Sequence, residues 1–350
     1  MSLDEAAAQA IACGVLVVAL TRPAAAAQTL HGDVRALETN LPLPFSTVVL
    51  QPGVTGRFTS DSGAFAFHDL AAGDYRIIVR AIGYLPFDSV ITVARDSLVL
   101  HVTLRPLAIE LPPVTVVATR ACVRPGPPAR DSEPELAAIF DQLRENAARY
   151  RLLSDAYPFE YWTQRRVWDE PRGHGDSVVV DTMELRSDAH LPYKPGGLII
   201  TQPGPRGRAE RTLRLPTVID LADSVFHQSH CFTFAGVDNV DGESHWRVDF
   251  LAADRLRLAD VAGSAWLDSA TYVLRQLTFR LTHPERALKS LKTLEATVTF
   301  GELFPSVTVP VYTVATSEAR TRSRNPVTGH QEQRLLRVNF LRGAPGSQPP

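Results

Sequence analysis

Hydrophobic and polar positions alternate in many short segments along this chain, which is the pattern of β-strands with one buried face. The first group of segments lies within residues 28–106, where turn residues recur at intervals of about 8–12 residues, as in β-sandwiches. The predicted strands are Thr29–Leu37, Phe45–Gln51, Gly56–Thr59, Ala64–His68, Asp74–Ala81, Ser89–Val93 and Ser97–Leu104. We therefore predict a seven-stranded β-sandwich for this part of the chain.

The turns between these segments carry distinctive residues. Asp61 can accept a hydrogen bond from the backbone two residues on, and Gly63 can adopt a positive φ without steric cost. The main interpretation of Asp61 is a turn residue, and the alternative is a calcium or sugar ligand. A tyrosine that follows such a turn ties a strand corner through its hydroxyl in other sandwiches. The remaining predicted turn residues are Gly73, Tyr75, Gly83 and Tyr84.

These motifs in this order resemble the carboxypeptidase regulatory-like domain, a transthyretin-like sandwich with a carbohydrate-binding-like fold. That family occurs beside zinc carboxypeptidase domains and at the front of TonB-dependent outer-membrane receptors. The resemblance implies a non-catalytic folding or docking module. The residues that carry it are Gly32, Asp33, Val34, Val48, Val49, Leu50, Thr59, Asp61, Gly63, Phe65, Phe67, Leu70, Gly73, Tyr75, Ala81, Gly83 and Tyr84.

A proline-rich linker is predicted over residues 107–131, and its stretch 111–118 looks like the strand that leaves this module in outer-membrane receptors. A helix should follow. Ser132 is its expected N-cap, with proline in the first turn and a glutamate that completes a capping box. The helix carries one apolar stripe and should end near Arg151. The stripe consists of Leu136, Ile139, Phe140, Leu143 and Ala147.

Alternation returns after the helix, and residues 132–342 are predicted to form a helix plus a larger antiparallel β-domain, either a half-barrel or a sandwich. The hairpins around Trp246 and Trp266 resemble those of periplasmic lipoprotein-carrier half-barrels, and no site residue transfers from that resemblance. The tail 343–350 is rich in proline and glycine and is predicted to be disordered. The predicted strands of this domain are Phe159–Trp168, Ser177–Arg186, Leu198–Gln202, His230–Ala235, His245–Leu251, Ala262–Leu267, Tyr272–Leu281, Ala296–Phe300, Tyr312–Thr321 and Gln333–Phe340.

The first 27 residues read as a secretory signal peptide. Ile11–Leu20 is an apolar run followed by small residues, and it is too short to span a bilayer well. Asp4 and Glu5 depart from the basic start of such signals, so an ordinary buried helix is the alternative. Cys13 offers a weaker lipoprotein interpretation. No later segment is apolar enough to form a transmembrane helix.

Removal of the signal would leave two cysteines, Cys122 and Cys231. An oxidising compartment favours a disulfide between them, and two separate buried thiols are the alternative. Together with the signal, the pair predicts an exported protein of the periplasm or the outer membrane.

Charge and motifs limit the function. The 36 basic and 38 acidic residues give a net charge of −2, so nucleic acid is not an expected partner. The spacings of zinc peptidases, serine hydrolases, dinucleotide-binding folds and P-loops are absent from the sequence. We therefore predict no catalytic residues, no cofactor and no metal.

Four weaker candidate sites remain. His227, His230 and Cys231 have a spacing that could bind zinc, but a strand would turn them to opposite faces and a disulfide would consume the thiol. The acids Asp249, Asp254 and Asp268 could supply a carboxylate pair for hydrolysis. Other candidate residues are an arginine prong, Arg320, Arg322 and Arg324, for anionic lipid or lipopolysaccharide, and four tryptophans, Trp162, Trp168, Trp246 and Trp266, for an apolar cradle.

The sequence thus favours a non-enzymatic secreted cell-envelope protein. We predict a binding or docking module for a glycan, an apolar ligand such as a lipid, or another envelope protein. The alternatives are a hydrolase that uses acidic residues of the second domain and a structural spacer.

Overall fold

The computed structural model describes residues 28–94, 97–107, 121–169, 178–189, 191–203, 209–240, 242–320 and 326–343. The predicted signal peptide, most of the predicted linker and nearly all of the predicted tail lie outside these residues. Within the described part of the chain, no helix is both long enough and apolar enough to cross a membrane.

The first domain is a β-sandwich of seven strands, as predicted. One sheet has the order β4-β1-β7 and the other has the order β3-β2-β5-β6. Strand β1 runs parallel to β7 and antiparallel to β4. The strands are β1 (Gln28–Ala36), β2 (Thr47–Gln51), β3 (Val54–Phe58), β4 (Ala64–Leu70), β5 (Gly73–Arg80), β6 (Phe87–Val93) and β7 (Leu98–Leu104).

Alternate side chains of these strands fill the space between the two sheets. The centre of this core contains Leu30, Val34, Leu50, Phe67 and Ile77, all of them almost inaccessible to solvent. Gly32 is required where β1 approaches β7, because an added Cβ would lie 1.9 Å from the Leu100 carbonyl oxygen.

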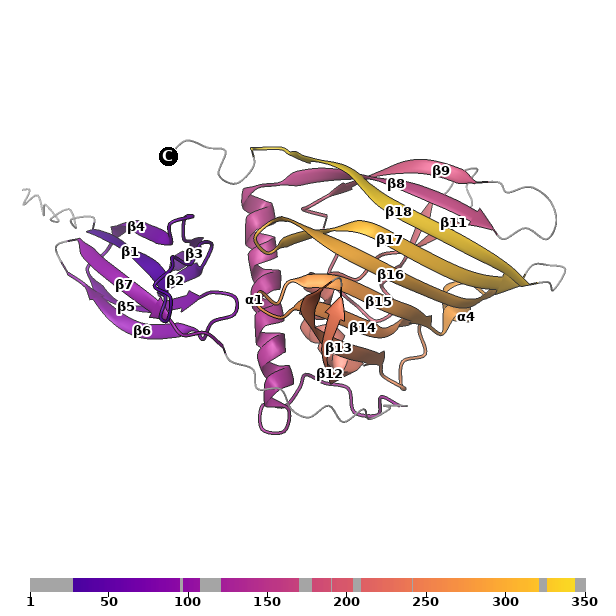
Figure 1. Ribbon diagram of the computed structural model, residues 1–350, viewed down its shortest axis with the longest axis horizontal. Helices are drawn as coiled ribbons and strands as arrows, with labels where there is room; N and C mark the ends of the chain where they lie inside the picture. The colour runs from indigo at the N-terminus through magenta and orange to yellow at the C-terminus, as the bar shows by residue number, and fades with distance from the viewer. Residues whose placement is uncertain are drawn as a thin grey trace, which may run out of the picture.

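The second domain is built on one antiparallel sheet of nine strands, in the order β12-β13-β14-β15-β16-β17-β18-β8-β9 (Figure 1). This confirms the predicted larger antiparallel domain. A separate hairpin pairs β10 (Ile199–Pro203) with β11 (Ala209–Leu213). The strands of the large sheet are β8 (Phe159–Asp169), β9 (Val179–Arg186), β12 (His230–Val240), β13 (Glu243–Ala252), β14 (Asp260–Asp268), β15 (Leu274–Thr282), β16 (Leu291–Phe304), β17 (Val307–Arg320) and β18 (Pro326–Phe340).

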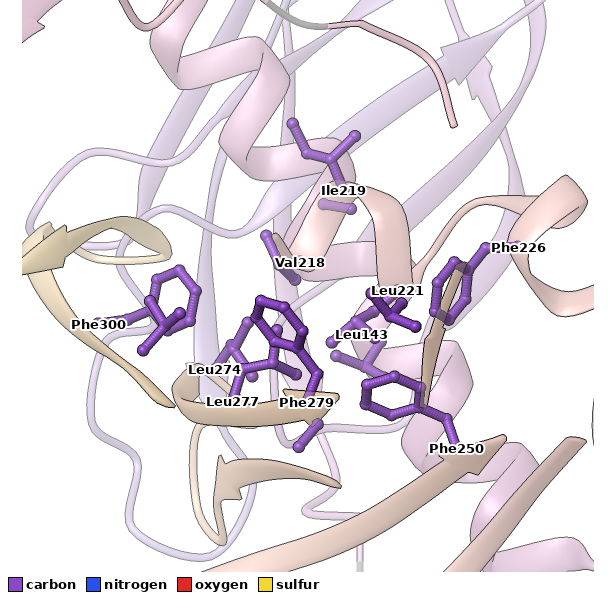
Figure 2. Close-up of a cluster of buried hydrophobic side chains, with 14 of the residues drawn as sticks. Leu143, Val218, Ile219, Leu221, Phe226, Phe250, Leu274, Leu277, Phe279 and Phe300 are labelled. Atoms are coloured by element: carbon purple, nitrogen blue, oxygen red, sulfur yellow. The ribbon is translucent and has the colours of Figure 1, made fainter. Parts of the chain in front are cut away.

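The apolar face of the large sheet packs against three helices: α1 (Pro134–Ala156), α2 (Val218–Leu221) and α3 (Ser224–Ser229). A fourth short helix, α4 (Pro284–Ala287), precedes β16. Figure 2 shows Leu143 of α1 and Leu221 of α2 among the aromatic rings of the sheet. The interior next to the helices is therefore occupied by side chains of the protein itself.

Helix α1 differs from the sequence prediction at both ends. It begins at Pro134 with Glu133 as N-cap and no side-chain capping bond, so the predicted Ser132 capping box is wrong. Ser132 instead donates its backbone N–H to the carbonyl of Ala129, in a turn that precedes the helix. The helix also continues past Arg151 to Ala156, because Leu153 extends the buried stripe by another turn. Pro158 then disfavours helical backbone at the residue before it.

Helix α1 also contacts the β-sandwich of the first domain. Its Gln142 side chain accepts a 2.9 Å hydrogen bond from the backbone N–H of Gly83. Its Glu145 carboxylate accepts a 3.0 Å hydrogen bond from the Thr47 hydroxyl and lies 3.7 Å from the Arg80 guanidinium. Figure 1 shows α1 standing between the sandwich and the large sheet, across the strand direction. Both domains therefore pack against one element.

Candidate functional site

A groove of about 990 Å³ opens between the sandwich and the last turns of α1. Docking involves the middle of the helix, at Gln142 and Glu145, whereas the groove is lined by Leu153, Ala156 and Tyr157 near its end. The two domains are thus in contact at the middle turns of α1 and are separated by the groove near its C-terminal end. The space between them is the candidate binding site.

One wall of the groove is polar and belongs to the outer face of the sheet β4-β1-β7. Residues His31 and Asp33 alternate with the buried residues of β1, so both point away from the sandwich core. Parallel pairing with β7 places His101 directly opposite Asp33. The His101 Nδ1 atom lies 2.5 Å from the Asp33 carboxylate, and Arg35 donates a 2.6 Å bond to the same group.

These contacts set the charge of the wall. The hydrogen bond from His101, followed by that from Arg35, holds the pKa of Asp33 below its ordinary value. Asp33 is therefore ionised in the folded protein at neutral pH, and it orients the side chains of His101 and Arg35. His68 of β4 also lines this wall.

The other wall is mostly apolar. Phe45 and Phe58 come from the edge of the sandwich, and both also pack against the core of the second domain. Tyr157 lies on the helix side, and its ring stands edge-on to that of Phe304 at 6.3 Å between centroids. The groove therefore presents aromatic surface opposite hydrogen-bonding groups.

The turn that carries Asp61 lies at the groove. Gly63 has a φ of 77°, and its backbone N–H donates to the carbonyl of Ser60 at 2.8 Å. An added Cβ at Gly63 would lie 2.6 Å from the Val34 carbonyl oxygen, which explains the glycine. Asp61 is exposed on this turn and lines the groove. Asp61 is therefore a turn residue that is also accessible to a ligand in the groove.

The other predicted turn residues lie at strand corners. Gly73 begins β5 with a φ of 156°, and the Tyr75 hydroxyl donates a 3.1 Å bond to the carbonyl of Ala71. Gly83 has a φ of 79° and contacts the second domain through Gln142, while Tyr84 closes the same turn with a backbone bond to Ala81. Sequence reasoning assigned Gly83 to a turn and missed its part in docking.

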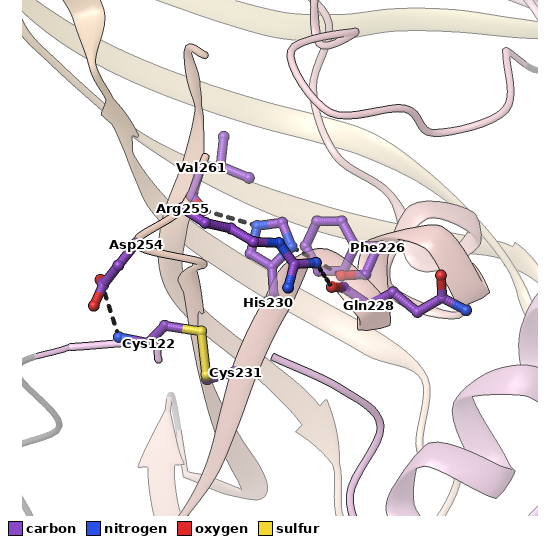
Figure 3. The surroundings of a disulfide bond; sticks show 8 residues. All are labelled: Cys122, Phe226, Gln228, His230, Cys231, Asp254, Arg255 and Val261. Carbon is purple, nitrogen blue, oxygen red and sulfur yellow. Dashed lines mark hydrogen bonds between the residues drawn. A yellow bond between two sulfur atoms is a disulfide. The ribbon is translucent and has the colours of Figure 1, made fainter. Parts of the chain in front are cut away.

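A disulfide joins Cys122 to Cys231, 109 positions apart (Figure 3). The Cys122 backbone N–H donates to the Asp254 carboxylate at 3.1 Å, and its carbonyl accepts from the Asp254 N–H at 3.0 Å. The Gly126 N–H donates to the carbonyl of His230 at 3.1 Å. The segment 122–126 therefore covers the edge of the sheet at β12, which would otherwise expose unpaired backbone groups.

The two histidines proposed as zinc ligands are buried. The His227 Nε2 atom lies 2.6 Å from the Leu221 carbonyl oxygen, and His230 lies between the carbonyls of Phe226 and Val261 at 2.9 and 3.0 Å. Burial lowers the pKa of both rings. Within the described part of the chain, no group of three histidine, cysteine or acidic side chains could hold a metal ion.

The three acids considered for hydrolysis have separate partners. Asp249 accepts from Arg247 at 2.8 Å and from the Ser264 hydroxyl at 2.6 Å. Asp254 accepts from the Cys122 backbone. Asp268 accepts the Thr271 backbone N–H at 2.7 Å; burial alone raises its pKa, but hydrogen bonds and a nearby arginine bring the net pKa below the ordinary value.

The four tryptophans do not share one cradle. Trp246 is buried in the core, whereas Trp266 stands opposite Arg247 on the other face of the sheet. Trp162 and Trp168 lie on the outer face of β8.

Of the predicted arginine prong, Arg320 ends β17, and Arg322 and Arg324 lie outside the described residues.

The sequence of the first domain matches a known family model. Residues 29–105 match the family model of the carboxypeptidase regulatory-like domain. This confirms the resemblance predicted for the sandwich, and the match covers less than a quarter of the chain. No curated protein matches the chain.

Solved structures show distant similarity. A type II cohesin–X-dockerin complex from Acetivibrio cellulolyticus is 18% identical over 22% of this chain and 56% of its own, with a TM-score of 0.20. A LolA superfamily protein from Nitrosomonas europaea is 12% identical over 59% of this chain and 94% of its own, at 0.29. A DUF1329 family protein from Desulfovibrio piger is 8% identical with the same coverage, at 0.33. The chain spans about half the length of the first structures that it matches.

Proposed function

We propose that this protein is an exported, non-enzymatic binding protein of the cell envelope, and that the groove between its two domains takes a glycan. The observation that carries the proposal is the composition of the groove. Its aromatic side, with Phe45, Phe58 and Tyr157, faces the polar side with Asp33 and His31. A sugar ring has an apolar face and a rim of hydroxyl groups, so it matches both sides at once.

The size of the groove supports a ligand of several sugar units. Ligand sites of about 300–1,000 Å³ hold drug-sized molecules, and this groove is at the upper end of that range. The ionised Asp33 and the exposed Asp61 are acceptors for sugar hydroxyls. An apolar ligand alone would offer no hydrogen bond to either acid.

The compartment is part of the proposal. The disulfide between Cys122 and Cys231 favours an oxidising environment. The signal-like first 27 residues favour export, and the carboxypeptidase regulatory-like domain suits a docking or binding role in the envelope. Mass spectrometry of the protein from its native cells, reporting the mature N-terminus, tests this part.

Calorimetric titration with chitohexaose, a neutral glycan, tests the groove. We expect binding that the Asp61→Asn variant weakens about tenfold, because a charge-assisted hydrogen bond to the carboxylate is replaced by a weaker neutral one to the amide. The matched control is Asp131→Asn, because Asp131 is an exposed acid before the opposite end of α1. Equal losses in both variants, or no heat with this probe and with a panel of other neutral oligosaccharides, would reject a glycan in the groove.

A further inference from the structure

A second surface lies on the outer face of the large sheet, away from the helices. Strand β18 pairs with β8 so that Arg337 is opposite Trp162, Arg334 is opposite Gln164 and Glu332 is opposite Arg166. Tyr312 of β17 is opposite Arg334 on the other side. The neighbouring Phe159 and Tyr161 alternate with Trp162 and contact the core, so this set faces outward.

Arginine and aromatic side chains are stacked in this set. The Arg337 guanidinium carbon lies 4.1 Å from the centre of the Trp162 ring. Arg334 lies 5.3 Å from the Tyr312 ring, and Arg166 lies 5.9 Å from the Trp168 ring. We call these three stacks, Arg337 on Trp162, Arg334 on Tyr312 and Arg166 on Trp168, the arginine ladder.

Stacking orients each guanidinium but leaves its edge available. A guanidinium that lies over an aromatic ring is attracted to the ring face, and it keeps several N–H donors that can bond to a ligand. The aromatic ring also reduces the conformational freedom that a free arginine would lose on binding. The ladder therefore presents preorganised donor forks, the group that matches carboxylate, sulfate and phosphate oxygens.

The exposure of the charged groups on this surface also favours an anionic ligand. Glu332 lies 3.7 Å from Arg166 and 4.0 Å from Arg334, so one carboxylate is shared between two arginines. Its side chain is 22% exposed, against 62% for Arg334. No carboxylate of the described residues forms an ion pair with Arg337, although Glu184 stands on the next strand opposite Trp162. Arg334 is therefore more exposed than the carboxylate it shares with Arg166, while Glu184 is an exposed acid at the edge of this set.

The geometry points to an acidic polysaccharide as the ligand of the arginine ladder. Arg166, Gln164 and Trp162 occupy alternate positions of β8, so the three arginines lie on successive outward rungs about 7 Å apart. Such a row fits an extended chain that carries repeated anionic groups. The tryptophan and tyrosine edges between the arginines offer apolar surface to the sugar rings.

This site is independent of the groove. The groove lies beside α1 and the sandwich, whereas the ladder is on β8, β17 and β18 and faces away from the helical side. A protein with both sites would contact two glycan segments, and linked sites raise the overall affinity through effective concentration.

Binding of dextran sulfate, measured by tryptophan fluorescence and calorimetry on the full chain, tests the proposal, with dextran as the uncharged probe. We expect dextran sulfate to bind, dextran not to bind, and affinity to fall steeply with salt. The double variant Arg334→Gln/Arg337→Gln should weaken binding by about tenfold or more, and it should also flatten the salt dependence. Circular dichroism of the variant confirms that it is folded.

Arg280→Gln is the matched control, because Arg280 is an exposed arginine of β15 on the same sheet. It should change the affinity by no more than about twofold, as expected of an isolated surface charge. The groove variant Asp61→Asn should also bind dextran sulfate normally, which separates this site from the proposed function. Equal losses in the control and the ladder variant would overturn the proposal. So would equal binding of dextran, or binding to anionic phosphatidylglycerol vesicles with none to dextran sulfate.

Discussion

Removal of the disulfide should destabilise the second domain by about 4 kcal/mol. The bond closes a loop of 109 positions, and in the chain-entropy model a loop of about 100 residues contributes about 4.7 kcal/mol by restricting the unfolded chain. Three hydrogen bonds still hold the segment 122–126: two join Cys122 to Asp254, just after β13, and one joins Gly126 to His230 at the start of β12. They should keep the native position of this segment, so the loss acts mainly through the unfolded state.

The comparison requires the oxidised protein and the Cys122→Ala/Cys231→Ala variant, both unfolded in urea at equilibrium. Tryptophan fluorescence reports the second domain, because all four tryptophans, Trp162, Trp168, Trp246 and Trp266, belong to it. In thermal unfolding of the same two proteins, the melting temperature of the variant should be lower by about 10–15 °C. A reductant should destabilise the natural protein and leave the variant unchanged. If the reductant has no effect on the natural protein, or an equal effect on both, the reasoning is wrong.

Further changes test the core, the domain contact and the pH dependence. Phe140→Ala should cost about 3–5 kcal/mol in urea unfolding, because its ring is buried 4.7 Å from that of Phe232, whereas Leu152→Ala, 42% exposed on the same helix, should cost little. Gln142→Ala leaves a backbone donor unpaired between the domains, so small-angle scattering should show a wider separation of domains. Asp268 has a lowered pKa in the folded state, so its stabilisation is complete above its ordinary pKa of 3.8 and is lost as pH falls through the lower folded value. Asp268→Asn should therefore flatten the acid dependence of the urea midpoint between about pH 5 and pH 2.

Local patterns were sufficient to predict the sandwich. Glycines such as Gly63 are required by backbone geometry within a few residues, and the alternation along β7 reflects one buried face. These are short-range constraints, so they can be read from a single sequence. The same reasoning failed at α2 and α3, which are too short to show a helical period, and at the start of α1, where no side chain caps the helix.

The candidate sites depend on long-range pairing. The groove exists because Gly83 docks on Gln142, and nothing near either residue in the sequence indicates the other. The arginine ladder requires Trp162 and Arg337 to be opposite each other, although they belong to the first and last strands of the second domain. Sequence reasoning singled out Trp162 and could not find its partner, because strand register is set by the whole sheet.

The pairing of β18 with β8 also sets the order in which a nascent chain can complete its fold. The hairpin β8–β9 is synthesised before the rest of the sheet, yet it joins that sheet only through β18, the last strand. Folding of this domain must therefore wait until β18 has been synthesised, and the high contact order predicts slow maturation. A protein truncated before residue 326 would retain the hairpin without the neighbour that anchors it.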